Sequence, residues 1–265
     1  MRRLFIDECL SEDITIKGDD AKHLLYAMRV RPEQVFTIVD RESKVAQAKV
    51  ISCTSDTVQL KLLQYIEDAD TEAPIEVVVA QCLPKGDKME FIVQKAVELG
   101  ASSVVPVVSR HCVVKYDDKK KLARQQKWQK IADEAVKQCG RTIKPTVEAI
   151  VSLEQLAKDY ADYTRFICYE AEDEQSFKEM LQSADSKKYL ILIGPEGGFA
   201  PEEVQLCKDA GFKSISMGKR ILRAETASIA ALTIVMYEKG DLGVSSHHFD
   251  DSERGFSFRF DGKLD

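Results

Sequence analysis

The chain has 265 residues, of which 44% are hydrophobic and 31% charged, and its formal net charge is −6. This length and apolar content can form a buried core and are enough for two domains, while the negative charge argues against a protein that simply coats nucleic acid. No apolar stretch is long enough to span a bilayer, so we expect no membrane partner. The N-terminal MRRLFIDECL lacks the apolar centre of a signal peptide, which favours a cytoplasmic protein.

The first 65 residues contain short apolar runs broken by Asp, Ser and Gly, a pattern that predicts a small β-rich module. These runs cover residues 4–6, 14–16, 35–39, 45–51 and 58–62. A polar segment follows over residues 67–74, and we interpret it as a linker.

From residue 75 onward, strand-like and helix-like segments alternate, which predicts an α/β domain with a largely parallel sheet. Strands are expected at residues 75–82, 103–108, 164–170, 189–193 and 214–217. One helix is expected to begin near Asp87, with Glu90 three residues on as its capping partner. A long helix should end before Gly140.

The cysteines and histidines give little sign of a metal site. Seven cysteines are scattered along the chain, and none stands in a C-x-x-C pair. This pattern indicates neither a disulfide framework nor a zinc site. His111 stands beside Cys112, but neighbouring residues of a strand point to opposite faces, and the four histidines do not cluster. We therefore expect no metal.

A glycine-bearing turn follows the apolar run at residues 189–193 and reads GPEGGF. Gly197 and Gly198 can adopt backbone angles closed to other residues and let a ligand approach the main chain. Pro201 marks the first turn of a helix. The spacing fits neither a P-loop nor a dinucleotide fingerprint, and a tight turn without a ligand is the alternative.

A second such turn, GKRILRAET, follows the short run at residues 214–217. It leads into a helix over residues 227–237, with Thr226 as its expected cap. That helix is apolar on nearly every face, so it should be buried in the core or against another subunit. In isolation the turn could be a solvated basic loop. Two such turns on successive strands favour a shared ligand cleft.

A basic segment lies between residues 115 and 144, where ten Lys or Arg residues stand against four acidic residues. A phosphate backbone could dock there. The same lysines could equally form the solvated face of a helix, because Trp128, Ile131 and Ala135 already supply a buried stripe.

GPEGGF, followed by a short helix, a strand and MGKRILRAETA, resembles the RsmE-type ribosomal RNA (uracil-N3)-methyltransferases of the SPOUT superfamily. Further matches are KGDKMEFIVQKAVELGASSVVPVVSRH from Lys85, WQKIADEAVKQCGR from Trp128 and HLLYAMRV from His23. The resemblance covers residues 1–243. The tail over 244–265 matches nothing in the family, and we expect it to be flexible, although its phenylalanines alternate like a short edge strand.

The resemblance implies a PUA-like RNA-binding β-barrel over residues 1–72 and a SPOUT methyltransferase domain with a C-terminal trefoil knot over residues 73–243. It also implies S-adenosylmethionine as cofactor, a homodimer, and methylation of N3 of a uridine in small-subunit ribosomal RNA, a step of ribosome biogenesis. A knotted chain is rare enough that sequence patterns alone would not suggest it.

Site residues are carried over by motif. The cofactor residues are expected to be Tyr169, Glu170, Ile193, Gly194, Pro195, Gly197, Gly198, Met217, Gly218, Ile221, Leu222, Arg223, Thr226 and Ala227. The RNA-contacting residues are expected to be Arg2, Arg3, His23, Arg29, Lys85, Lys95, Arg110 and Arg141. Lys95 could equally be a surface residue.

Methylation of uracil N3 requires loss of its proton, after which negative charge spreads to the carbonyl oxygens. Arg223 is the candidate that stabilises this anion, and Glu225 or Glu196 is the candidate that receives the proton. Glu225 could instead complement the dipole of its helix. Two other functions remain open, a SPOUT enzyme with another target nucleotide or a ribose target, and a non-catalytic RNA-binding ribosome-assembly protein. Intact glycine turns argue against the second.

Overall fold

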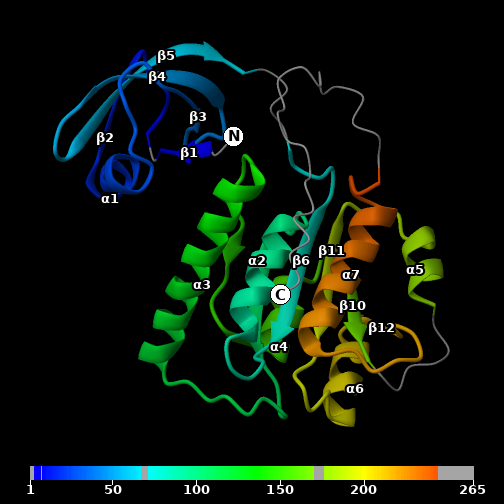
Figure 1. Cartoon of the computed structure of the whole chain (residues 1–265). Helices are drawn as coiled ribbons and strands as arrows, with labels where there is room; N and C mark the ends of the chain where they lie inside the picture. Colours follow the sequence, from blue (N-terminus) through cyan, green and yellow to red (C-terminus); the bar gives the residue numbers. More distant parts are fainter. Residues whose placement is uncertain (1–2, 7, 67–70, 170–175, 244–265) are drawn as a thin grey trace, which may run out of the picture.

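The computed structural model describes residues 3–6, 8–66, 71–169 and 176–243 of the chain, which form two sheets with their helices (Figure 1). The expected tail over residues 244–265, with its alternating phenylalanines, lies outside the described residues. No helix in the described part combines the length and the apolar character that crossing a membrane requires.

The N-terminal sheet has five strands in the order β1-β3-β4-β5-β2, and all five expected apolar runs contribute a strand. The strands are β1 (Arg3–Phe5), β2 (Asp13–Lys17), β3 (Val35–Val39), β4 (Val45–Cys53) and β5 (Thr57–Tyr65). β1 runs parallel to β3, and the other pairs are antiparallel. The β4–β5 register shifts twice. Such irregularities bend a ladder, and the sheet curls around α1 (Gly18–Lys22) and a π-helix over His23–Ala27 (Figure 1).

The second sheet is entirely parallel among its described strands, which confirms the α/β expectation. Its order is β12-β10-β11-β6-β7-β8, with β9 also paired to β7. The strands are β6 (Glu76–Cys82), β7 (Ser103–Val108), β8 (Thr146–Val147), β9 (Val151–Ser152), β10 (Thr164–Cys168), β11 (Lys188–Ile193) and β12 (Lys213–Ile215). Parallel strands covered on both faces need continuous apolar runs, and β11 is buried from Tyr189 to Ile193.

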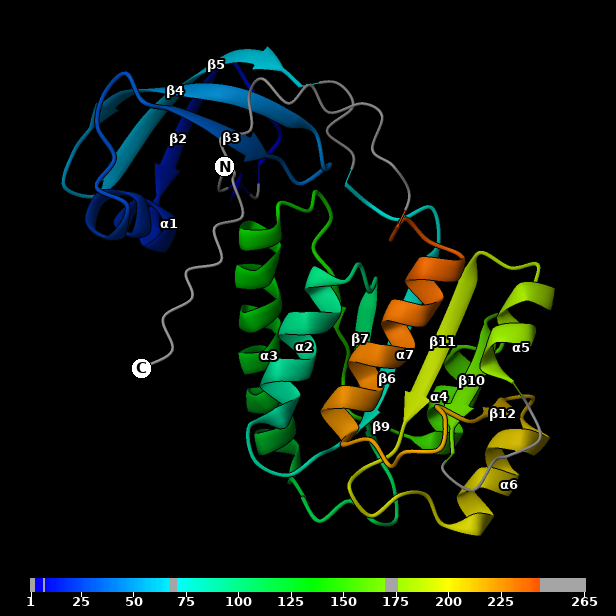
Figure 2. The same ribbon diagram turned by 45° about the vertical axis from the view of Figure 1, so that its right-hand side comes forward.

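Six helices accompany this sheet in the described part of the chain. They are α2 (Lys88–Glu98), α3 (Asp118–Cys139), α4 (Leu153–Asp159), α5 (Phe177–Ser183), α6 (Pro201–Asp209) and α7 (Ala224–Glu238). α2 packs between α3 and α7, and the three lie side by side in both views (Figure 2). α7 also packs on β6 and β11, at the centre of the sheet.

The expected helix ends are confirmed at three places and wrong at two. Pro201 is the first residue of α6, α3 ends at Gly140 with φ +79°, and α2 follows Asp87. The Asp87 side chain makes no capping hydrogen bond, because its backbone lacks the extended conformation that aims a capping side chain. Thr226 is not a cap, since α7 begins at Ala224 and Thr226 lies in its first turn.

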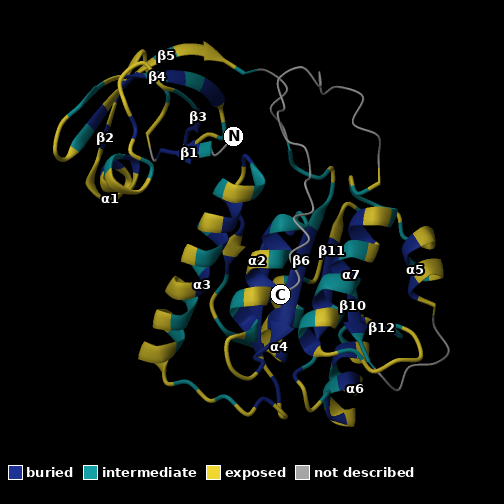
Figure 3. Ribbon diagram, viewed as in Figure 1, coloured by how far each residue is buried: buried dark blue, intermediate teal, exposed yellow. Residues whose placement is uncertain are grey.

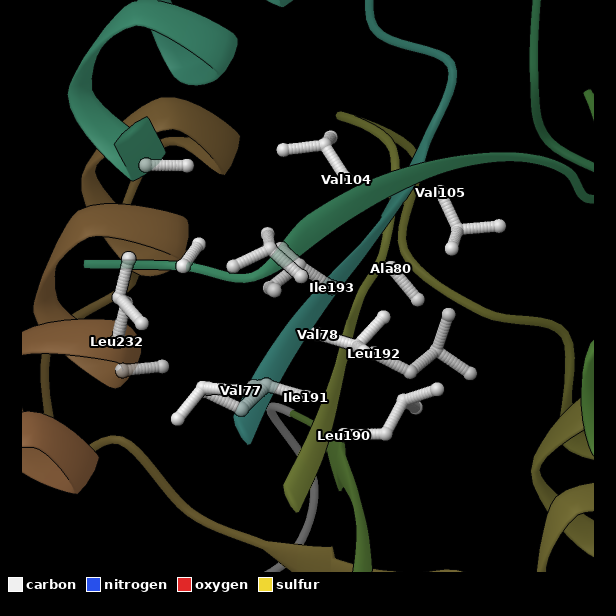
Figure 4. Packing of buried hydrophobic residues seen from close by; sticks show 14 of the residues in the cluster. Val77, Val78, Ala80, Val104, Val105, Leu190, Ile191, Leu192, Ile193 and Leu232 are labelled. Atoms are coloured by element: carbon white, nitrogen blue, oxygen red, sulfur yellow. The ribbon is translucent and has the colours of Figure 1, made fainter. Parts of the chain in front are cut away.

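The core of the parallel sheet is aliphatic. β6, β7 and β11 bring Val77, Val104 and Ile191 to one face of the sheet, and Leu232 of α7 lies on that side (Figure 4). Phe5 of β1 belongs to the same buried cluster. The two sheets therefore share a packed junction, and the remaining apolar residues of the N-terminal sheet form a core of their own.

Candidate functional site

A cavity of about 650 Å³ opens where β10, β11 and β12 end. These strands are parallel neighbours, so their carboxyl ends meet at one edge of the sheet, the usual place for ligands in α/β folds. The segments that follow the strands form its walls. The lining residues are Lys88, Cys168, Tyr169, Ile193, Gly194, Pro195, Glu196, Gly198, Phe199, Ser216, Met217, Gly218, Lys219, Arg220, Ile221, Leu222, Arg223, Ala224 and Ala227.

The first turn, defined here as residues 194–198, has little room for side chains at its glycines. Gly198 has φ +66°, a conformation that favours glycine, and its N–H donates to the Pro195 carbonyl at 2.9 Å. A Cβ on Gly197 would come within 3.0 Å of the His111 Cβ, and one on Gly194 within 3.1 Å of the Phe199 ring. The glycines expected at the cofactor turn are therefore required by its geometry.

Neighbouring segments hold the first turn in place. The His111 Nδ1 lies 3.0 Å from the Gly197 carbonyl oxygen and 3.2 Å from that of Gly198. Carbonyl oxygens only accept, so this nitrogen carries a proton. At the start of the turn, the buried Gln81 amide donates to the Gly194 carbonyl at 3.1 Å. The Ser228 hydroxyl of α7 donates to the Gln81 Oε1.

The second turn, defined here as residues 216–223, has far fewer contacts. Gly218 has φ +100°, and its N–H donates to the Ser216 hydroxyl at 3.2 Å. Ile221 is 87% exposed. Within the part of the chain that the structure describes, Arg220 and Arg223 are exposed and make no side-chain hydrogen bond or ion pair. This side of the cavity therefore offers unused cationic donors.

Three charged residues meet beside the first turn. The Lys88 Nζ donates to the Glu196 Oε1 at 2.9 Å and lies 3.4 Å from the Glu225 Oε2. The Glu196 carboxylate also accepts the backbone N–H of Lys85 at 3.1 Å. The Glu225 Oε2 is buried and has no hydrogen-bond partner among the described residues. Glu225 is not one of the residues that line the cavity, but it forms an ion pair with Lys88, which does line it.

Two side chains of the cavity wall have shifted pKa values. Burial favours the protonated form of Glu196, but the hydrogen bonds from Lys88 and from backbone N–H groups outweigh it and hold the pKa below its ordinary value. Glu196 is therefore ionised at neutral pH. Burial raises the pKa of the Cys168 thiol to about 12, so this cysteine stays neutral and is no nucleophile.

The structure brings most of the predicted cofactor residues to one cavity. All of them line it except three. Gly197 contacts His111 behind the turn, Thr226 points away on an exposed position of α7, and Glu170 lies outside the described residues. Arg223 and Glu196, two of the candidate catalytic residues, are both in the wall.

The predicted RNA residues are spread more widely. Arg3 and His23 line a smaller cavity of about 300 Å³ between the N-terminal sheet and α3. Arg29 and Lys85 are exposed, and Arg29 has φ +51°. Two others are paired and one is not described. Lys95 binds Glu98, Arg110 binds Glu202, and Arg2 lies outside the described residues.

Arg141 must be removed from the RNA-contacting set, because its side chain is buried. Its guanidinium donates to the Glu72 carboxylate and to the carbonyl oxygens of Val97 and Ala101. Burial alone would favour the protonated form of Glu72, but Arg141 and two backbone N–H groups hold its pKa below the ordinary value. Breaking such a buried pair is costly. Arg141 therefore anchors Glu72, in the second half of the expected linker, to the parallel-sheet domain.

Sequence analysis missed three residues that shape the cavity. Lys88 bridges two carboxylates, Gln81 holds the start of the first turn, and His111 holds its end. A buried glutamine within an apolar strand is an unusual choice, and IEVVVAQC contained that signal. Lys88 lies in the family segment that begins at Lys85, but nothing in that segment indicates its role, because its partner Glu196 is 108 residues away.

Comparison with known proteins identifies the family. A model described as "RNA methyltransferase domain" matches residues 71–236, and one described as "RNA methyltransferase PUA domain" matches residues 16–63. The chain belongs to this RNA methyltransferase family. A similar family member is the ribosomal RNA small subunit methyltransferase E of Bacillus subtilis, 32% identical over 90% of this chain and 97% of the relative.

Solved structures of the family show the same fold. The ribosomal RNA small subunit methyltransferase E of Neisseria gonorrhoeae, bound to S-adenosylmethionine, has a TM-score of 0.83 and 30% identity over 91% of this chain and 99% of its own. A methyltransferase from Legionella pneumophila, in complex with the same cofactor, has a TM-score of 0.82 and 27% identity over 91% and 98%. The resemblance drawn from the motifs is confirmed.

Proposed function

We propose that the protein methylates N3 of a specific uridine in small-subunit ribosomal RNA, with S-adenosylmethionine as the methyl donor. The observation that carries the proposal is the cavity between the two glycine-bearing turns, in a chain whose relatives are named for this RNA and one of which holds this cofactor. A non-catalytic RNA-binding protein would have no need for the crowded glycines of the first turn.

The residues present fit the cofactor. About 650 Å³ is within the range of small-molecule sites. The left-handed Gly198 lets a ligand approach the backbone of the first turn, while Ile193, Pro195 and Leu222 supply apolar surface for a flat adenine ring. The other predicted cofactor residues in the wall would complete the site, with Tyr169 closing the side after β10.

When bound, the cofactor supplies a methyl group on a positively charged sulfur and leaves as a neutral thioether. The protein must therefore prepare the uracil, whose N3 carries a proton and shares its lone pair with two carbonyl groups. Arg223 is free of intramolecular partners in the described part of the chain, so its guanidinium can donate to a carbonyl oxygen as negative charge develops there.

Glu225 is the better of the two candidate proton acceptors. The carboxylate of Glu196 already accepts from Lys88 and from the Lys85 backbone, and its lowered pKa makes it a weak base. In the described part of the chain, the Glu225 Oε2 accepts no hydrogen bond and has the Lys88 ammonium, 3.4 Å away, as its ion-pair partner. The Glu225 side chain is 19% exposed and a carboxylate has further acceptor sites, so it can accept an N–H group from a ligand.

We assign RNA docking to residues 1–72 as a PUA-like barrel, and cofactor binding and chemistry to residues 73–243 as a SPOUT domain. Arg3, His23 and the exposed Arg29 would contact phosphates beside the basic face of α3. The trefoil knot fits the path of the chain, which returns from the edge strand β12 to the sheet centre through α7. We propose that this methylation takes place in the cytoplasm during ribosome biogenesis.

A homodimer fits the outer face of α7. Ile234 is 38% and Tyr237 68% exposed on α7, and a second copy would cover them. Light scattering at micromolar concentration tests this state. A monomer that still methylates RNA would contradict it.

The function is tested by mass spectrometry of ribosomal RNA from cells with and without the protein. Loss of a single 3-methyluridine from the small-subunit RNA is the expected result. Loss of a ribose methyl or of another methylated base would redirect the proposal to a different target, and an unchanged nucleoside profile would refute the proposed reaction.

A further inference from the structure

Lys88 lines the cavity, and its ammonium group has N–H donors that no residue in the described part of the chain uses. It is the first residue of α2, and its side chain lines the cavity wall. An ammonium group carries three N–H donors. In the described part of the chain one of them is used in a hydrogen bond, to Glu196 at 2.9 Å, while Glu225 forms an ion pair at 3.4 Å without hydrogen-bond geometry. At least one donor can therefore serve a ligand.

The charges around Lys88 keep it protonated and favour a neutral ligand. The hydrogen bond to Glu196 raises the pKa of Lys88, against a smaller effect of burial. Two carboxylates, one from the first turn and one from α7, share this single ammonium group. A ligand that already carries a full negative charge would be repelled there, whereas a neutral carbonyl oxygen would be accepted.

The imide edge of uracil has a defined pattern, with a carbonyl acceptor on either side of the N3–H donor. A complementary protein surface needs a donor, an acceptor and a second donor. Lys88 and Arg223 supply the two donors from the cavity wall, and Glu225, which lies beside Lys88 with 19% of its side chain exposed, supplies the acceptor where the adjacent helices α2 and α7 begin. Helix N-termini also stabilise negative charge, so both would favour the anion that forms when N3 loses its proton.

We propose that Lys88, Glu225 and Arg223 recognise the imide edge of the target uracil, with Lys88 and Arg223 donating to its two carbonyl oxygens and Glu225 accepting the N3 proton. This inference rests on the proposed function. The N3–H bond breaks, its proton forms an O–H bond on the Glu225 carboxylate, and its electron pair stays on the base, where N3 uses it to bind the incoming methyl group. Glu196 positions Lys88.

The first arm of the test measures single-turnover methylation at saturating cofactor and RNA. Lys88→Met should lower the rate about a hundredfold, the usual effect of losing one donor to a developing oxyanion, and Lys88→Arg should restore most of it. Calorimetric affinity for S-adenosylmethionine should change little. Lys188→Met is the matched control, because it breaks the Lys188–Asp162 ion pair at the opposite end of β11 and should leave the rate unchanged.

The second arm uses RNAs whose target uracil carries sulfur in place of one carbonyl oxygen, which is a weaker acceptor. One of the two thio-substitutions should slow the wild-type protein and have no further effect in Lys88→Met, since both changes remove the same contact. A binding measurement accompanies it. With the demethylated cofactor present, the wild type should prefer uridine over cytidine at the target position, and Lys88→Met should lose much of that preference.

The outcomes separate the two proposals. If the wild type makes no 3-methyluridine in unmodified RNA, the proposed function fails and the inference with it. If the wild type does and folded Lys88→Met matches it, only the inference fails. A Lys88→Met variant that loses cofactor affinity as much as rate would place Lys88 on the cofactor carboxylate. If each thio-substitution slows Lys88→Met by the same factor as it slows the wild type, Lys88 does not contact either carbonyl oxygen of the uracil, and the inference fails.

Discussion

The two turns that wall the cavity differ sharply in how the protein holds them. In the first turn, residues 194–198, His111 and Gln81 bind the backbone carbonyls, and Glu196 is held by Lys88. In the second turn, residues 216–223, one hydrogen bond between backbone and side chain is described, in which the Gly218 N–H donates to the Ser216 hydroxyl. In Figure 3 the segment between β12 and α7, which contains the second turn, is drawn largely in the colour of exposed residues.

The difference indicates two roles. A turn with its carbonyls fixed by two side chains and its glutamate by a third is preorganised, so binding a ligand costs little free energy for ordering the turn. A turn with exposed Ile221 and unpaired arginines has low local stability and gains its contacts from the ligand, the RNA or a second copy of the chain. Cofactor affinity should therefore depend mainly on the first turn, and the chemical step on the second.

The largest expected effect is from Gly198→Val in the first turn. A β-branched residue at φ +66° is strained, and its side chain would stand where the cofactor approaches the backbone. We expect calorimetry to show a loss of S-adenosylmethionine affinity of about a hundredfold or more. Gly18→Val is the matched control, because Gly18, at the start of α1, has φ +67° with open space around it. Equal affinity in folded Gly198→Val would remove this turn from the site.

Arg223→Ala tests the second turn. Loss of a donor used mainly in the transition state should lower the single-turnover rate about a hundredfold at saturating cofactor and RNA, with much smaller effects on binding. Arg220→Ala is its neighbouring control, and we expect a smaller change in rate. Were Arg223→Ala to lose cofactor affinity and keep its rate, the arginine would belong to binding and the division between the turns would fail.

Glu225→Gln removes the expected proton acceptor next to the second turn. Its defect should be greatest at low pH and partly rescued at high pH, where solvent can take the N3 proton. The measurement is the pH dependence of the single-turnover rate. A defect of equal size at every pH would make Glu225 a structural residue that complements the dipole of α7.

Proteolysis compares the order of the second turn with and without ligand. Trypsin should cut after Lys219 or Arg220 in the free protein, and saturating cofactor should slow this cut about tenfold, because bound cofactor stabilises the ordered form of the second turn. Cleavage after the exposed Arg41, in the β3–β4 connection, should not change. Equal protection at both places would indicate a global effect on stability.

The smallest expected effect is from His111→Ala, which removes one support of the first turn. A hydrogen bond is worth about 1 kcal/mol, so cofactor affinity should fall about fivefold in a calorimetric titration. A loss as large as that of Gly198→Val would show that the turn depends on His111 alone.

Much of the fold could be predicted because burial leaves a direct record in the sequence. The five N-terminal apolar runs and the continuous run of β11 became strands, since a strand buried on one face alternates and a strand buried on both faces does not. The start of α7 was wrong by three residues because Arg223 and Ala224 carry no capping signal, while Thr226 does.

The site was predictable where a residue type is forced by the backbone and not where it depends on distant partners. The first turn requires a left-handed backbone at residue 198, which favours glycine, and the local motif GPEGGF indicates this. Arg141 was predicted to contact RNA, yet its side chain is buried and donates to Glu72 and to two carbonyl oxygens. The role of Lys88 could not be predicted from the sequence, because its contacts form only when α2, the first turn and α7 pack together.

The most direct test of the account is reconstitution. The purified protein is incubated with S-adenosylmethionine and small ribosomal subunits from cells that lack it, and the RNA nucleosides are analysed by mass spectrometry. The account predicts one new 3-methyluridine in the small-subunit RNA with the wild type and none with Gly198→Val. A methyl group on a ribose or on another base, or no methylated nucleoside at all with the wild type, would contradict it.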